Sequence, residues 1–403
     1  MNRTAALLIG LLAGSGALYA LDWGVNVNEL PLVMTGQKTL GYSGTQVKLW
    51  FTSPLSGMDF RLETLGALSA SSSDLYATNQ NLVSSVTLDV SEASLAGLGA
   101  WDGGRGGVFE WSLGRRAVTD LTGGWIVDSR WDGASVSGQI GDAKIGLATG
   151  YSGLLLNSTG RVAESPADVA DQSNTSLLFG PKRLFGSLWV GLNEAFWRQD
   201  LQTEILGDWD FRPGDQAVHG AYMTVALTGP LAGGFRHRLF GTGSMRISPS
   251  SANPGFLAGG ELSANYSFLG SRVVLGAVAA WAREGVGFQP LSGDGLAEVV
   301  SLPTTHGASV KVDYSIRPVS HVLVGIKANS LWRTSKDPAV LSGIREDSHD
   351  AWLGTEGGFY GSWNPTSDFS LGWSGGVFLP QSGAFASNTQ VTGLAAVSVG
   401  LKL

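Results

Sequence analysis

The 403-residue sequence contains no cysteine, only five histidines and only 15% charged residues. The lack of cysteine excludes a disulfide framework and any metal site built from thiolates. The histidines are scattered, and the chain has no His-Glu-x-x-His pair, no phosphate-binding glycine loop and no Gly-x-Ser-x-Gly elbow. Because metalloproteases, nucleotide-binding enzymes and serine hydrolases carry these patterns, we expect neither an enzyme nor a bound cofactor or metal.

Long apolar runs are also scarce. After the N-terminal segment, none reaches eighteen consecutive apolar residues, so no helical membrane anchor is expected. The start, "MNRTAALLIGLLAGSGALYA", has one cation at Arg3, an apolar run over residues 5–17 and small residues toward Ala20. This order is typical of a secretory signal peptide. We expect residues 1–20 to be removed by cleavage after Ala20 or, alternatively, after Ala17, and residues 21–403 to form one exported domain.

The dominant feature of the chain is strict alternation of apolar and polar residues. In "ASVKVDYSIRPVSHVLVGIKANSLW" (308–332), Val310, Val312 and Tyr314 alternate with Lys311 and Asp313, and the pattern resumes after a turn. Successive side chains of a strand point to opposite faces, so each strand has one apolar and one polar face. The apolar face packs on a second layer in a soluble sheet, or meets lipid in a membrane barrel.

The lengths of the connections distinguish these two folds. Short connections are expected at 140–142, 228–234, 268–271, 317–320 and 364–367, and longer ones at 152–181, 249–254, 285–303, 335–349 and 381–388. Short turns at one end and long loops at the other are typical of outer-membrane barrels. The pattern therefore predicts an all-β fold: a single transmembrane, antiparallel, up-and-down β-barrel of about 16–18 strands. A secreted soluble β-protein is the alternative fold.

The predicted strands number eighteen, which satisfies the even number expected of a bacterial single-chain barrel, and sixteen is the alternative. Their ranges are 23–35, 44–54, 58–71, 84–95, 106–114, 132–140, 142–151, 183–193, 198–211, 216–229, 233–248, 255–268, 270–285, 304–317, 319–335, 350–364, 366–380 and 389–403.

Taken together, the signal peptide, the alternating strands and the sorted connections resemble porin-type outer-membrane channels. The stretch "FEWSLGRRAVTDLTGGWIVDSRWDGASV" (109–136) is similar to segments of porins and alginate-export-type barrels. This resemblance implies that Arg115 or Arg116 points into the lumen near a constriction. The final residue departs from the pattern, because Leu403 stands where such barrels usually end in phenylalanine or tryptophan.

The polar strand faces carry more basic than acidic residues. Eleven cationic positions are expected in the lumen: Lys48, Arg61, Lys144, Arg183, Arg236, Arg238, Arg246, Arg272, Lys311, Lys327 and Arg333. Six anionic positions accompany them: Glu63, Glu110, Glu284, Asp313, Glu356 and Asp368. Most other acids, including Glu164, Asp168 and Glu298, are expected in loops. A basic lining favours anions; alternatively, these charges pair across strands and only fill the interior.

These features predict a channel for passive diffusion of small hydrophilic solutes, with a preference for anions. The candidate pore-lining residues are Arg115, Arg116, Arg183, Arg236, Arg238, Arg246, Lys311, Lys327, Arg333, Glu110 and Glu356. Expected partners are outer-membrane lipid, the barrel-assembly machinery and the solutes; a homo-oligomer is compatible with the pattern. Nucleic acid is not expected, since the net charge is −7. The alternative is a structural or adhesin-type barrel plugged by the loop at 152–181, which contains Leu154, Leu155 and Leu156.

Overall fold

The computed structural model describes residues 22–35, 40–55, 58–72, 82–101, 107–152, 162, 164–174, 181–283, 286–292, 295–300, 302, 304–335, 344–345, 347–385 and 391–402. The predicted signal peptide, Leu154 to Leu156 and Glu284 lie outside these residues.

Most of the described chain is β-strand. The strands are β1 (Asp22–Thr35), β2 (Leu40–Leu55), β3 (Met58–Ser72), β4 (Leu82–Trp101), β5 (Gly107–Thr119), β6 (Asp128–Ile140), β7 (Ala143–Tyr151), β8 (Arg183–Phe196), β9 (Gln199–Asp210), β10 (His219–Pro230), β11 (Phe235–Ser248), β12 (Ser251–Asn265), β13 (Arg272–Arg283), β14 (Val286–Gly287), β15 (Gly307–Val319), β16 (Val322–Arg333), β17 (Trp352–Trp363), β18 (Phe369–Pro380) and β19 (Thr392–Lys402).

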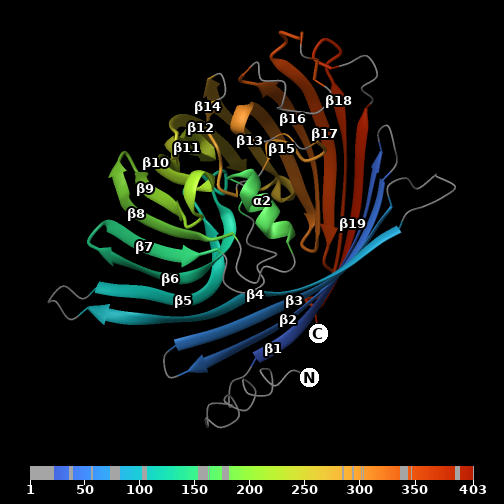
Figure 1. Ribbon diagram of the computed structural model, residues 1–403. Coiled ribbons are helices and arrows are strands. Elements are labelled where there is room, and N and C mark those ends of the chain that lie inside the picture. The colour runs from blue at the N-terminus through green and yellow to red at the C-terminus, as the bar shows by residue number, and fades with distance from the viewer. Residues whose placement is uncertain are drawn as a thin grey trace.

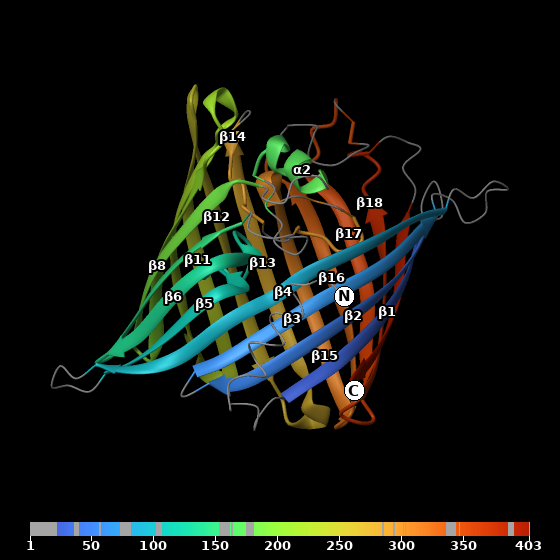
Figure 2. The ribbon, with the colours of Figure 1, turned by 60° about the horizontal axis from the view of Figure 1, so that its bottom comes forward.

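The strands close into a barrel. Each pairs antiparallel with its neighbour in the chain, and β1 pairs with both β2 and β19, so the sheet has no free edge. The two-residue β14 pairs only with the end of β13, and β13 pairs directly with β15. In the described part of the chain, the wall is therefore an eighteen-stranded, up-and-down barrel (Figures 1 and 2). The predicted fold class is confirmed, and every predicted strand range overlaps one wall strand.

The two faces of the wall differ as the alternation predicts. In β8, Leu184 and Leu188 on the outer face are 43% and 44% exposed, whereas Arg183, Phe185 and Ser187 on the inner face are buried. Apolar side chains also stay exposed on the outside of β15, where Val310 and Val312 alternate with inward residues. A row of solvent-exposed apolar side chains around a closed wall is the surface that lipid covers in a membrane barrel.

One predicted long connection is wrong. Residues 249–254 were expected to form a loop, but β11 and β12 continue to a tight turn in which Ser248 pairs with Ser251. Pro254 lies inside β12, where the sequence suggested a break. α2 (Pro166–Ser173) and β14, which belong to two of the other long connections, are drawn toward the same end of the barrel in Figure 2.

The hydrophobic core lies inside the barrel, between the wall and segments that fold inward from the long-loop end. Figure 1 shows α2 within the ring of strands. Buried apolar residues come from the inner wall and from the inward segments, as in the stack of Trp131 on Phe185, whose ring centroids are 4.7 Å apart, and the edge contact of Tyr222 with Phe288. Within the described residues, no helix has the length and apolar character needed to cross a membrane.

Candidate functional site in the barrel interior

The inward segment at 162–174 is joined to the wall through the guanidinium group of Arg183. Arg183 lies at the start of β8, and its side chain is completely buried. It donates to Glu164 at 2.7 Å and to both carboxylate oxygens of Asp168 at 3.0 Å. It also donates to Asp208 and, at 3.3 Å, to Asp210 at the end of β9. A planar five-donor group suits this role, because it can bond several carboxylates at once.

The sequence of the segment explains why a helix forms inside the barrel. Ser165 caps α2: its hydroxyl accepts the Asp168 N–H, and the Asp168 carboxylate accepts the Ser165 N–H. Pro166 stands at the first helical position, where its missing N–H costs nothing. The capping aspartate is also the ligand of Arg183, so the start of the helix and its attachment to the wall depend on one carboxylate.

Two further arginines hold the same segment. Arg212, between β9 and β10, donates to Asp168 at 2.7 Å and to Asp171 at 2.8 Å. Arg246 of β11 donates to the main-chain carbonyl of Glu164 at 2.7 Å. Hydrogen bonds from Arg183 and Arg212 hold the pKa of Asp168 below its usual value, although burial alone would raise it.

Glu164 differs from the other carboxylates of this cluster. Burial raises its pKa well above the usual value, and the negative charge of Asp208 raises it further, against the opposing charge of Arg183. Among the described residues, Oε1 of Glu164 and Oδ2 of Asp208 have no hydrogen-bond partner. Both atoms lie beside Gly220, where a Cβ would meet them at 3.1 and 2.2 Å. Two buried carboxylates in this arrangement favour a proton on one of them.

A second inward segment covers residues 120–127, between β5 and β6. The carboxylate of Asp120 accepts main-chain N–H groups of Thr122, Ile126 and Val127, which closes the turn. The turn is held to the wall by Glu204 of β9, which accepts the Leu121 N–H at 2.8 Å. Arg238 of β11 donates to the Leu121 carbonyl.

A third inward segment, residues 286–302, contacts the wall at β16 and β17. Glu356 of β17 accepts three consecutive main-chain N–H groups, from Glu298 at 3.0 Å, Val299 at 2.8 Å and Val300 at 3.0 Å. Asn329 of β16 donates to the carbonyl of Leu296 at 2.8 Å. These wall residues therefore fix the backbone of the segment, and the side chain of Glu298 extends from it.

Glu298 contacts two lysines of the wall. Oε1 lies 3.3 Å from Nζ of Lys311 on β15, and Oε2 accepts a hydrogen bond from Lys327 on β16. Burial would raise the pKa of Glu298, but the hydrogen bond and charge of Lys327 and the charge of Lys311 hold it below its usual value. The carboxylate is therefore ionised at neutral pH.

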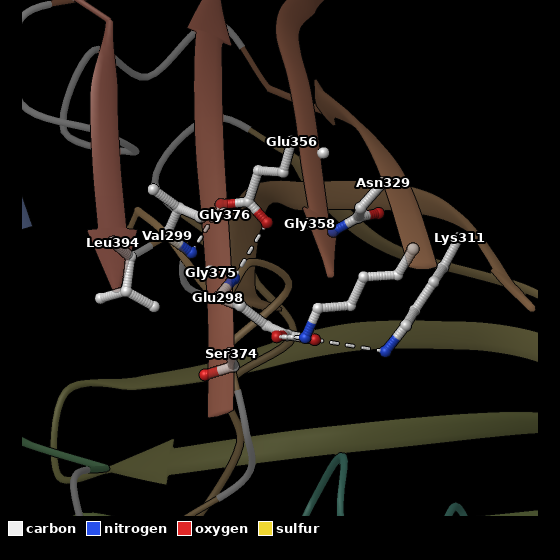
Figure 3. Close-up of a pocket in the computed structure, with 12 residues that line it drawn as sticks. Glu298, Val299, Lys311, Asn329, Glu356, Gly358, Ser374, Gly375, Gly376 and Leu394 are labelled. Atoms are coloured by element: carbon white, nitrogen blue, oxygen red, sulfur yellow. Dashed lines mark hydrogen bonds and ion pairs between the residues drawn. The ribbon is translucent and has the colours of Figure 1, made fainter. Parts of the chain in front are cut away.

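A small pocket of about 30 Å³ lies beside this contact (Figure 3). Two wall glycines that pair across β17 and β18, Gly358 and Gly376, make room for it. A Cβ on Gly376 would meet Val299 at 2.9 Å, and one on Gly358 would meet the Lys327 side chain at 3.2 Å. The lining residues are Glu298, Val299, Lys311, Lys327, Asn329, Glu356, Gly357, Gly358, Ser374, Gly375, Gly376 and Leu394.

The other candidate pore-lining residues occupy different surroundings. Arg115 is 1% exposed and bonds Asp132 at 2.7 and 2.8 Å and Asp89 at 3.2 Å. Arg116, beside it on β5, is half-buried. Arg333 is buried at the end of β16 and donates to the main-chain carbonyls of Ser348 and Asp350.

Two candidates are exposed: Arg236 at the start of β11 and Glu110 on β5. Arg236 faces the interior near the short-turn end. The structure brings Lys311, Lys327 and Glu356 together at one place, and Arg183 and Arg246 at another, whereas Arg115 lies apart from both.

The acids of the inward segments are the functional residues that the sequence did not reveal. Glu164, Asp168 and Glu298 were expected in loops and were not expected to contact the lumen charges, yet they contact basic residues of the inner wall. The capping pattern "SPAD" at 165–168 is a sequence signal that could have indicated local order in the longest loop. In the part of the chain that the structure describes, no group of three or more metal-ligating side chains is arranged to hold a metal ion.

No family model matches the chain, and no curated protein does. Solved structures of outer-membrane proteins from Pseudomonas aeruginosa are similar in fold. OccK5 (OpdH) is 10% identical, with a TM-score of 0.60 over 96% of this chain and 99% of that one. OccK2 (OpdF) in complex with glucuronate is 14% identical, with a TM-score of 0.60 over 97% and 99%. The outer membrane protein OpdK is 10% identical, with a TM-score of 0.59 over 96% and 100%.

Barrel closure and these similarities together define the class: the chain has the fold of porin-type outer-membrane β-barrels. Identities this low identify a shared fold and no more.

Proposed function

We propose that the protein is an outer-membrane channel through which small hydrophilic solutes diffuse passively. The main support for this proposal is the closed eighteen-stranded wall, which has an apolar outer face and a charged inner face. Barrels of sixteen to eighteen strands ordinarily enclose an aqueous channel, because their circumference exceeds what wall side chains can fill. The fold shared with OccK5 and OpdK supports the same function.

A preference for anions is the finer part of the proposal. It is supported by Lys311, Lys327 and Arg236, whose side chains are partly exposed in the interior. Rings or clusters of basic side chains lower the electrostatic barrier for anions. OccK2, which shares the fold, was solved with glucuronate.

The proposal places residues 1–20 in a cleaved signal peptide and the rest in the outer membrane, inserted by the barrel-assembly machinery and surrounded by lipid. It assigns no catalytic role to the chain. A homo-oligomer remains compatible with the exposed outer face, since porin-type barrels can associate through it.

A planar-bilayer recording tests the channel directly. Refolded protein is inserted under a KCl gradient, and the conductance and the reversal potential are measured. Stable conductance steps are expected, with a reversal potential on the anion-selective side. A cation-selective reversal potential would overturn the anion preference and leave the channel intact.

A plugged structural barrel is the second candidate function, and the inward segments favour it. The three segments pack apolar residues such as Ile126, Val162, Leu296 and Leu302 against the inner wall. Folded, membrane-inserted protein that gives no conductance steps would support this function and contradict the channel.

A further inference from the structure

Glu298 presents its carboxylate to two lysines at a point where the barrel interior is open. The side chain of Glu298 is 48% exposed, that of Lys311 44% and that of Lys327 21%. Lys327 is also oriented by the ring of Tyr360, whose centroid is 5.6 Å from Nζ. Figure 3 shows the carboxylate of Glu298 and the amine of Lys311 directed toward one another beside the pocket.

The position of the Glu298 backbone does not depend on Lys311 or Lys327. Glu356 holds the N–H groups of residues 298–300, and Asn329 holds the carbonyl of Leu296. The Glu298 side chain can therefore swing away from Lys311 and Lys327 while the segment stays in place.

A pair of ammonium groups spaced to hold one carboxylate of the protein can hold the carboxylate of a solute in the same way. We infer that Glu298 is a tethered competitor: it occupies an anion site formed by Lys311 and Lys327, and a solute carboxylate must displace it. This inference rests on the proposed channel function and names the residue that sets its selectivity.

The physical basis is effective concentration. A group attached to a short chain near its site is present there at millimolar or higher effective concentration. A solute can then bind only at the fraction of sites that Glu298 does not occupy. If that fraction is about one tenth, removing the competitor raises the apparent affinity for a carboxylate about tenfold.

The experiment compares the wild-type protein with Glu298→Gln in planar bilayers, with gluconate as the probe. The amide keeps the size of the side chain and leaves the main-chain bonds to Glu356 intact. The expected results are a reversal potential shifted toward anions and a gluconate concentration for half-block that falls about tenfold. Adding Lys311→Met and Lys327→Met to Glu298→Gln should abolish the gain in gluconate block.

A matched control is present on the wall. Glu261 of β12 is also an interior acid, with its side chain 47% exposed, and it lies 3.6 Å from Arg272. Glu261→Gln removes the same charge without freeing the lysine pair, so gluconate block should stay at the wild-type level.

Three outcomes overturn the inference: unchanged gluconate block in Glu298→Gln, an equal gain in Glu261→Gln, or a gain that survives loss of both lysines. Each of them leaves an active channel. Absence of conductance in the folded wild-type protein would instead contradict the proposed function itself. Glu298→Ala also removes the carboxylate, so it should give the same result as Glu298→Gln. Different results from these two variants would contradict the inference that the Glu298 carboxylate competes with the solute.

Discussion

At the scale of single residues, Arg183 is the group on which the attachment of the inward segment at 162–174 depends. Replacing it by leucine leaves Glu164, Asp168, Asp208 and Asp210 buried without their shared cation. Breaking a buried ionic cluster by removing one partner costs about 3–5 kcal/mol. We expect Arg183→Leu to release residues 164–174 from the wall, with faster proteolysis inside the segment and a higher single-channel conductance.

The neighbouring Lys182 supplies the control for this prediction. Its side chain is exposed, so Lys182→Leu should behave as the wild type in both measurements. Continued protection of residues 164–174 in Arg183→Leu would show that the segment is held by its apolar contacts and not by the ionic cluster.

At the scale of elements, we expect the attachment of α2 to depend on pH. Asp208, Arg183 and Arg246 face the Glu164 carboxyl, and the raised pKa of Glu164 means that the attached segment binds a proton more tightly than the released one. The contribution of Glu164 to attachment is therefore fully present below its usual pKa of 4.5 and is lost as the pH rises through the raised value. We expect the segment to become more mobile with increasing pH.

A unique label measures this mobility. The chain has no cysteine, so a spin label on Val169→Cys, an exposed position of α2, reports the segment alone. The spectrum should sharpen as the pH rises, and Glu164→Gln, which mimics the protonated side chain, should stay immobile over the same range. Sharpening that persists in Glu164→Gln would assign the transition to another group.

The wall elements could be predicted from the sequence, and the interior could not. Strand alternation is a local signal, repeated in each of β1 to β19 except the short β14, and each wall strand reinforces the register of the next. The path of a loop depends on tertiary contacts. No local pattern in residues 286–302 predicts that their main-chain N–H groups bond to Glu356. The connection at 249–254 was wrong for a related reason, since Pro254 can lie within a strand where its missing N–H breaks no essential bond.

The same limit applies to the charges. The polar faces of the strands predicted basic residues in the lumen, among them Arg183, Arg238 and Lys327. The same prediction assigned Glu164 and Glu298 to loops. These acids instead return to the interior and pair with the basic residues. The charge balance inside the barrel therefore depends on both the wall and the inward segments. It cannot be predicted from the polar faces of the strands alone.

At the scale of the whole molecule, we expect the barrel wall to fold without α2. The pairing of β7 with β8 continues through Tyr151 and Leu184 without any bond from α2, and β8 also pairs with β9. Replacing residues 166–173 with a short glycine-serine linker should therefore leave a barrel that still shows heat-modifiable mobility on a gel.

In this deletion, Arg183 keeps Asp208 and Asp210 as partners, so no buried cation is left unpaired. Because α2 lies within the ring of strands, its removal should widen the aqueous path and raise the conductance above that of the wild type (Figure 1). An unfolded deletion variant would show that α2 is required to assemble the wall. A folded variant with wild-type conductance would show that the narrowest part of the path lies elsewhere, with the segments at 120–127 and 286–302 as the remaining elements that enter the interior.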